Sequence, residues 1–138
     1  MKLIPVLLLM MLLLTGCSSL FEDPKIRGSS EINEMNQTTL KEAENLALQN
    51  KDIFVRLPGI YINAENIEWV QNLKLTPNNQ AGVWVIDKKY EKGEPFAELM
   101  ATKLPLGTKV YRPVENYDVL LAEVNGKEIR YVRVDIKK

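Results

Sequence analysis

The feature that most constrains the fold is an Asn-Gly dipeptide between two runs of strand-forming residues near the C-terminus. Asn125-Gly126 separates residues 119–124 from 127–136, and both runs are rich in Val, Ile, Leu and Tyr. Asn-Gly is favoured in two-residue hairpin turns because both turn positions need a positive φ. The sequence therefore predicts an antiparallel hairpin with its turn at these two residues.

The short turn also determines which residues of the two strands lie opposite each other. Counting outward from it predicts the pairs Val124–Lys127, Ala122–Ile129, Leu120–Tyr131 and Asp118–Arg133 on one face, and Val119–Val132, Leu121–Arg130 and Glu123–Glu128 on the other. The last pair opposes like charges, at a small cost that Arg130 offsets if it leans across. Because both faces are largely apolar, the pattern favours a curved sheet or small barrel covered by a helix.

Earlier segments show the same period of two. Residues 53–57 alternate, Pro58-Gly59 marks a bend, and Ile60-Tyr61-Ile62 resumes extended structure. Residues 82–86 (Gly-Val-Trp-Val-Ile) are typical of a strand because β-branched and aromatic residues dominate them. Residues 104–111 predict a turn that leads into a further strand.

The helical signals are fewer. Thr39-Leu40-Lys41-Glu42 matches a capping box and predicts a helix that begins at Thr39 and ends near Asn50. An apolar stripe follows at helical spacing, formed by Leu40, Ala43, Leu46 and Ala47. The stripe is narrow, so a helix laid over the sheet is the preferred interpretation, with a partner-binding helix as the alternative.

Two further segments complete the predicted fold. Pro95 suits the first turn of a short helix with Phe96, Leu99 and Met100 on its apolar face. Residues 66–75 fit either a helix or a strand, and we expect a short helix or turn near Ile67 that passes into a strand. The predicted class is α+β: a small curved antiparallel sheet or partly closed barrel, one N-terminal amphipathic helix and a short second helix.

Residues 104–111 and the hairpin after them resemble the small SH3-like barrels of bacterial envelope proteins. The resemblance covers about residues 100–136 and lacks the Gly-Trp pairs that mark the versions that bind cell wall. It implies a shape and assigns no binding residues.

The N-terminal residues have the pattern of an export signal. Lys2 precedes an apolar run from Leu3 to Leu14, which is the layout of an export signal and is shorter than the roughly 20 residues that a membrane span needs. The quartet Leu14-Thr15-Gly16-Cys17 resembles the lipobox of bacterial lipoproteins, in which a peptidase cuts before a lipid-modified Cys. The resemblance implies a signal peptide over 1–16 and acyl chains on Cys17 that retain the protein on a membrane through lipid.

The same resemblance bears on location. Ser18-Ser19 lacks the Asp that holds many lipoproteins at the inner membrane of diderm bacteria. The expected site is therefore the outer membrane in a diderm, or the outer face of the cell membrane in a monoderm. The domain would be lipid-anchored and would face the periplasm or the exterior.

Domain organisation follows from the position of this signal. Residues 17–37 have little apolar periodicity, so we expect an acylated Cys and a flexible tether with a span of about 25 Å. Residues 38–138 then form a single globular α+β domain. Cleavage before Cys17 leaves 122 of the 138 residues, which suits one domain.

Composition excludes several classes of chemistry. The mature chain would carry 17 basic and 18 acidic side chains once Lys2 is removed, so nothing attracts it to nucleic acid. It has no His and one Cys, which excludes Ser-His and Cys-His catalysis and His/Cys zinc sites. The mature Ser residues all lie in the expected tether (Ser18, Ser19, Ser29 and Ser30). No catalytic, cofactor-binding or metal-ligating residue is predicted, and residues 87–94 match a calcium loop poorly because three Lys interrupt their acids.

Three functional hypotheses remain. The preferred one is a non-catalytic interaction or accessory module that docks on another envelope protein. The alternative is a ligand- or cell-wall-binding module with an aromatic surface patch drawn from Tyr61, Trp69, Trp84, Tyr90, Tyr111 and Tyr117. A small carboxylate-dependent enzyme is the third, with Asp87, Glu91, Glu94 and Glu98 as the available acids.

Overall fold

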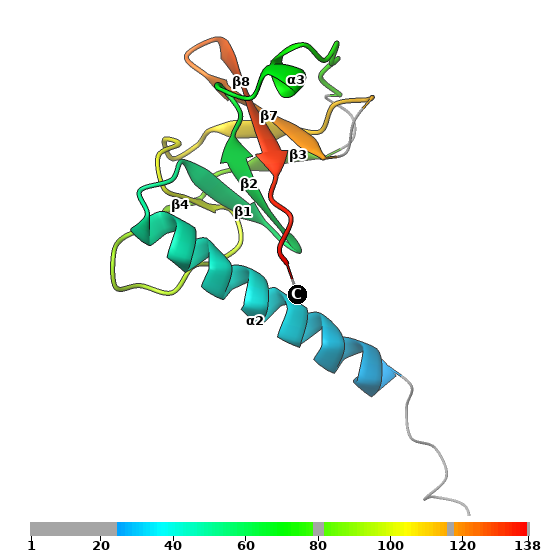
Figure 1. Cartoon of the computed structure of the whole chain (residues 1–138), viewed down its shortest axis with the longest axis vertical. Coiled ribbons are helices and arrows are strands. Elements are labelled where there is room, and N and C mark those ends of the chain that lie inside the picture. The colour runs from blue at the N-terminus through cyan, green and yellow to red at the C-terminus, as the bar shows by residue number, and fades with distance from the viewer. Residues whose placement is uncertain (1–24, 79–81, 116–117, 138) are drawn as a thin grey trace, which may run out of the picture. The chain divides into compact units, whose positions relative to one another are not determined.

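The structure, a computed structural model, describes residues 25–78, 82–115 and 118–137 (Figure 1). The chain divides into two units, Met1–Asn33 and Glu34–Lys138. In the described residues the helices are α2 (Lys25–Leu48) and α3 (Glu68–Gln71). The strands are β1 (Ile53–Arg56), β2 (Gly59–Asn63), β3 (Val83–Val85), β4 (Lys88–Lys89), β5 (Met100–Ala101), β6 (Lys109–Tyr111), β7 (Val119–Val124) and β8 (Lys127–Arg133).

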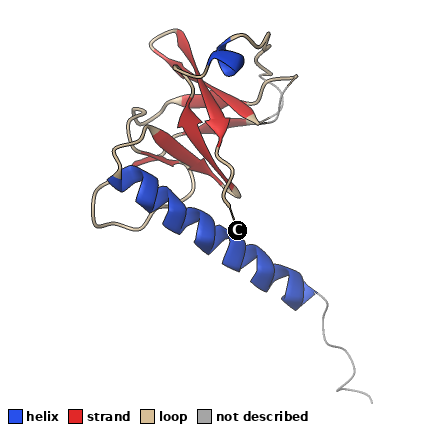
Figure 2. Cartoon of the chain, in the orientation of Figure 1, coloured by secondary structure: helices blue, strands red, loops and turns tan. Residues whose placement is uncertain are grey.

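These strands form one curled sheet in the order β3-β6-β7-β8-β2-β1-β5-β4 (Figure 2). Among the described strands every pairing is antiparallel except that of β4 with β5, which is parallel. The predicted α+β class with a small curved sheet is thus confirmed, with this one parallel pair as an addition.

The curl is closed by the chain itself. β3 and β4 stand at the two ends of the strand order, yet only Ile86 and Asp87 separate them in sequence. The amide of Ile86 donates to the Thr108 carbonyl at 2.9 Å, and the amide of Asp87 donates to the Leu99 carbonyl at 3.2 Å. Residues 83–89 therefore form one extended segment that pairs first with β6 and then with β5. This continuous pairing joins the two ends of the strand order.

The hairpin of β7 and β8 has the predicted register. All six of the predicted pairs from Val119–Val132 to Val124–Lys127 are present, and Asn125 and Gly126 both have positive φ. The amide of Arg133 donates to the Asp118 carbonyl at 2.8 Å, which continues the same register. Arg130 leans toward Glu128, with its Nε 3.5 Å from the carboxylate, and so offsets the Glu123–Glu128 repulsion.

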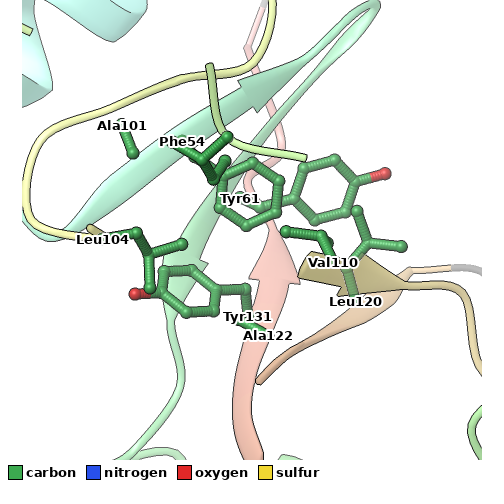
Figure 3. Close-up of a cluster of buried hydrophobic side chains, with 9 residues drawn as sticks. Phe54, Tyr61, Ala101, Leu104, Val110, Leu120, Ala122 and Tyr131 are labelled. Carbon is green, nitrogen blue, oxygen red and sulfur yellow. The ribbon is translucent and has the colours of Figure 1, made fainter. Parts of the chain in front are cut away.

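Both faces of the sheet are buried, because successive side chains of a strand point to opposite sides. On the inner face, Phe54, Tyr61, Leu120 and Tyr131 pack together, and the two Tyr hydroxyls point toward opposite ends of this cluster (Figure 3). The outer face carries two further clusters. One lies against α2 and contains Ala43, Ile53, Val55, Ile60, Phe96 and Met100; the other lies beside α3 and contains Ala64, Val70, Val119, Leu121 and Val132.

Helix α2 begins earlier than the sequence predicted. It runs from Lys25, so residues 25–37, expected in a flexible linker, are helical, while residues 17–24 lie outside the described residues. Between Pro24 and Pro58 the chain has no proline and only Gly28 as glycine, so little interrupts a helix.

The predicted capping box at Thr39 is therefore wrong. The Thr39 hydroxyl is buried, and it lies 3.0 Å from the Met35 carbonyl within the helix and 3.2 Å from the Pro58 carbonyl in the β1–β2 turn. The predicted end near Asn50 is confirmed. Asn50 has a φ of 60°, and the amide of Lys51 bonds back to the Leu46 carbonyl, as in a Schellman motif. Neither described helix is long and apolar enough to cross a membrane.

The short helix α3 confirms the expectation of a helix near Ile67, but residues 73–75 do not form the strand expected after it. Arg130 of β8 donates to the carbonyls of Val70 and Leu73, each at 2.7 Å, and so holds the end of this helix. The helix predicted from Pro95 is also absent. Leu99 has a φ of 55°, which a helix excludes, and the amide of Phe96 bonds to the Glu44 carboxylate of α2.

Candidate functional site at the seam of the sheet

The most distinctive surface of the described residues lies along the free edge of β3. We call this site the seam and define it by Val83, Trp84 and Val85 of β3 with Arg56 and Arg112, whose side chains lie over the Trp84 ring. Among the described strands, β3 pairs with β6 alone. Its other edge is left open over three residues.

The register of β3 shows which backbone groups the open edge presents. The Gly82 carbonyl accepts from Arg112 and the Ile86 amide donates to Thr108, so even-numbered residues bond toward β6. Since hydrogen-bonding directions alternate along an antiparallel strand, the N–H and C=O groups of Val83 and Val85 point away from β6. The edge therefore offers two donors and two acceptors, and it ends where Asp87 begins to pair with Leu99.

The side chains of β3 separate into two faces. Val83 and Val85 are 42% and 43% exposed. Trp84 points the other way, half-buried against the inner cluster. The edge is thus apolar outside and aromatic inside.

Two guanidinium groups lie over the Trp84 ring, that of Arg56 at 4.7 Å from its centre and that of Arg112 at 5.3 Å. Such cation–π contacts are attractive because the face of the ring is electron-rich. Gly82 makes room for this arrangement. It has a φ of 77°, and a Cβ there would lie 2.7 Å from the Trp84 ring.

Arg56 is the last residue of β1, and its side chain reaches the Trp84 ring of β3. One of its terminal nitrogens lies 2.9 Å from the Glu98 carboxylate and 2.9 Å from the Leu57 carbonyl. Its Nε is buried and has no hydrogen-bond partner among the described residues. An anion that reached this nitrogen would find a donor available.

A third arginine and a tyrosine lie close by. Burial raises the pKa of Tyr61, while the positive charges of Arg133, Arg112 and Arg56 act in the opposite direction and Asp118 adds to the rise. Gly59 allows Arg133 and Tyr61 to approach, since a Cβ there would lie 3.1 Å from the Tyr61 ring and 3.2 Å from the Arg133 Nε. Three guanidinium groups thus lie close enough to Tyr61 to act on its pKa, and one of them, that of Arg56, is paired with Glu98.

A second, weaker candidate is an open hollow of about 290 Å³ beside the β7–β8 hairpin. Pro77, Tyr111, Leu121 and two carboxylates, Glu123 and Glu128, contribute to its lining. The Tyr111 hydroxyl donates to Glu123 at 3.1 Å, and Arg130 lies against Glu128. Both carboxylates are therefore engaged by neighbouring side chains.

The polar group at the other end of the inner cluster supports the fold. The Tyr131 hydroxyl donates to Asp52 at 2.9 Å, and the Asn63 side-chain amide donates to the other Asp52 oxygen at 2.8 Å. Burial, and then the Asp52 charge and hydrogen bond, raise the pKa of Tyr131 well above its usual range. This network connects β8 and the end of β2 with the residue that precedes β1.

The aromatic residues expected to form a surface patch are dispersed. Tyr61 is in the core and Tyr90 stacks on Phe96 with ring centres 4.8 Å apart. Trp69 is 57% exposed on α3, and Trp84 lies in the seam under two arginines. Tyr111 is half-buried at the hollow, and Tyr117 lies outside the described residues.

The acidic residues considered for catalysis have separate surroundings. Glu98 pairs with Arg56, Glu94 pairs with Lys88 at 3.3 Å, and Asp87 and Glu91 are exposed. No group of three or more His, Cys, Asp or Glu side chains in the described ranges is placed to hold a metal ion. Cys17 lies outside the described residues.

No local sequence pattern indicates the seam, because Arg56 and Arg112 are far from Trp84 along the chain. Of its residues, Trp84 alone was singled out from the sequence, and as part of a different surface. Comparison with known proteins adds no relative: no family model matches the chain, and neither the curated proteins nor the solved structures contain a significant match.

Proposed function

We propose that this protein is a bacterial envelope lipoprotein, anchored by lipid on Cys17, whose barrel docks on another envelope protein through the seam. The Leu14-Thr15-Gly16-Cys17 quartet after an apolar run supports the anchor. The observation that carries the docking role is the open edge of β3.

An open strand edge is a template for pairing with another chain, and proteins usually protect such edges with charges, proline or a covering segment. The two ends of this sheet differ in that respect. β4 consists of two exposed lysines, Lys88 and Lys89, which discourage pairing. β3 instead exposes Val83 and Val85 beside backbone groups that have no strand partner within the described ranges. The contrast favours β3 as the surface that another protein covers.

The alternative, a binder of ligand or cell wall through aromatic rings, is less well supported. Such sites present rings side by side, whereas the candidate rings within the described residues lie in the core, in stacks or singly on the surface. We propose no catalytic activity, because the chain has no His and its one Cys would carry the lipid.

The proposed location follows from the residues after the acylated Cys. Ser18-Ser19 favours the outer membrane in a diderm host and the outer face of the cell membrane in a monoderm. Lipid anchoring holds the barrel among membrane neighbours at high effective concentration, so a modest docking surface is sufficient for occupancy.

The test is site-specific cross-linking in the native membrane. A photoreactive residue replaces Val85 in one strain and Lys127, exposed at the tip of the hairpin, in a matched control strain. We expect one envelope protein to be captured from position 85 and not from position 127. Equal capture from both positions, or none from position 85, would contradict docking through the seam.

A further inference from the structure

We infer that the partner contributes an extended segment with an acidic residue between two apolar residues, which adds to β3 as a further strand. This inference rests on the proposed docking function and specifies the chemistry of its partner. It follows from three properties of the seam: its backbone direction, the alternation of its side chains and its charge.

The backbone groups favour an extended peptide. The N–H and C=O groups of Val83 and Val85 point outward at the same edge, with the spacing of a β-strand. An added strand satisfies all four groups by main-chain hydrogen bonds, the mode known as β-augmentation. The added pairing cannot extend past Val85, because Asp87 already pairs with Leu99.

The alternation of side chains determines the pattern of the peptide. Residues opposite each other in a sheet point to the same face. Partner residues beside Val83 and Val85 therefore lie on the outer face, where apolar side chains cover two exposed valines. The residue between them points inward beside Trp84, toward Arg56 and Arg112.

The charge of the seam determines the middle residue. The guanidinium groups of Arg56 and Arg112 lie over the Trp84 ring, and the positive charges of both, with that of Arg133, act on the nearby Tyr61. The Arg56 Nε is buried with no partner among the described residues, and no salt bridge to Arg133 occurs in the part of the chain that the structure describes. A Glu or Asp of the partner supplies a negative charge beside these guanidinium groups and acceptors for their donors.

The binding test uses the full acylated chain in non-ionic detergent micelles. The sequence has two tryptophans, so Trp69→Phe leaves Trp84 as the one tryptophan whose fluorescence reports on the seam. The probe is the capped peptide Thr-Val-Glu-Val-Thr, and the matched control is Thr-Val-Lys-Val-Thr. We expect the Glu peptide to bind at least about tenfold more tightly, since one charge-assisted hydrogen bond is worth roughly that factor.

Two perturbations test the strand geometry. Val85→Pro removes one outward N–H while leaving the bonds of β3 to β6 in place, and it should weaken binding of the Glu peptide about tenfold. Because that variant alters the protein, N-methylated peptides provide a test that does not depend on its folding. Methylation at both valines blocks one strand direction and methylation at the glutamate blocks the other, so one of the two peptides must lose binding.

The outcomes separate this inference from the docking function. If the Glu and Lys peptides bind equally, or both N-methylated peptides bind as well as the parent, the acidic-strand inference is overturned. Mapping the adduct from position 85 then shows which segment of the partner lies beside β3. An apolar-acidic-apolar segment supports the inference, whereas a different segment overturns it and leaves the docking function standing. Absence of any adduct at position 85 overturns the docking function itself.

Discussion

Removal of the Tyr131 hydroxyl should lower stability at neutral pH and make little difference to stability near pH 11. Tyr131 is fully buried and its hydroxyl donates to Asp52 at 2.9 Å. The Tyr131→Phe variant loses this bond, although Asp52 keeps the Asn63 amide. A hydrogen bond to a charged group contributes about 1.5–3 kcal/mol, so we expect a loss of about 1.5 kcal/mol at pH 7.

At alkaline pH the wild-type chain loses this advantage. Burial raises the pKa of Tyr131 in the folded state, whereas an unfolded tyrosine ionises near pH 10. The stability that Tyr131 contributes is therefore complete below about pH 10 and declines as pH rises toward its folded-state pKa. The decline is about 1.4 kcal/mol for each pH unit above 10. By pH 11 the free energies of unfolding of wild type and Tyr131→Phe should nearly coincide.

Tyr61→Phe is the matched control, because burial also raises the pKa of Tyr61 but its hydroxyl makes no hydrogen bond to the described residues. The Tyr61→Phe variant should equal wild type at pH 7 and be more stable than wild type at pH 11, because the raised pKa of the buried Tyr61 makes its ionisation costly in the folded wild-type chain. The assay is urea unfolding of the full chain in non-ionic detergent, followed by tryptophan fluorescence from pH 7 to 11. A wild-type advantage over Tyr131→Phe that stays constant across this range would refute the reasoning.

Three further changes have simple expected results. Cys17→Ala should move the protein from the detergent-extractable membrane fraction to the soluble one, and unchanged retention would exclude the lipid anchor. Arg130→Met should lower the free energy of unfolding by about 2 kcal/mol, since it leaves the Val70 and Leu73 carbonyls without their donor; urea unfolding measures the loss, and an unchanged midpoint would contradict this role. A fragment of residues 38–138 should melt cooperatively, because it holds the sheet and all three buried clusters; a thermal scan without a transition would show otherwise.

The parts of the fold that could be predicted are those set by local chemistry. Asn125-Gly126 specifies its own turn, and a two-residue turn leaves one register for β7 and β8, so six of the seven predicted pairs were confirmed as strand pairs. The start of α2 could not be read in the same way. A Thr at position 39 is compatible with an N-cap, but it is equally compatible with the middle of a helix, where its hydroxyl bonds to the carbonyl four residues earlier. The second contact of this hydroxyl, with the Pro58 carbonyl, comes from the β1–β2 turn, which is distant in sequence.

Other features of the fold depend on contacts between residues that are distant in sequence, so no local sequence pattern predicts them. Pro95 suits the first turn of a helix, but the amide of the next residue, Phe96, donates a hydrogen bond to the Glu44 carboxylate. The positive φ of Leu99 then directs the chain into β5. The closure of the sheet at Ile86 and Asp87 needs partners from two distant segments. The seam likewise forms only when the curl brings Arg56 to Trp84, so the sequence predicted strand β3 without its surface.

The closure at Ile86 and Asp87 also has a mechanical consequence. A partner that pulls on β3 pulls on the same extended segment that continues as β4, and β4 is paired with β5. Met100 of β5 packs in one cluster with Ala43 of α2, and the nearby Phe96 amide is bonded to Glu44. Tension applied at the edge of β3 would thus pass through strand pairing and the Phe96–Glu44 hydrogen bond to the C-terminal half of α2, so that edge and the helix should resist a pull together.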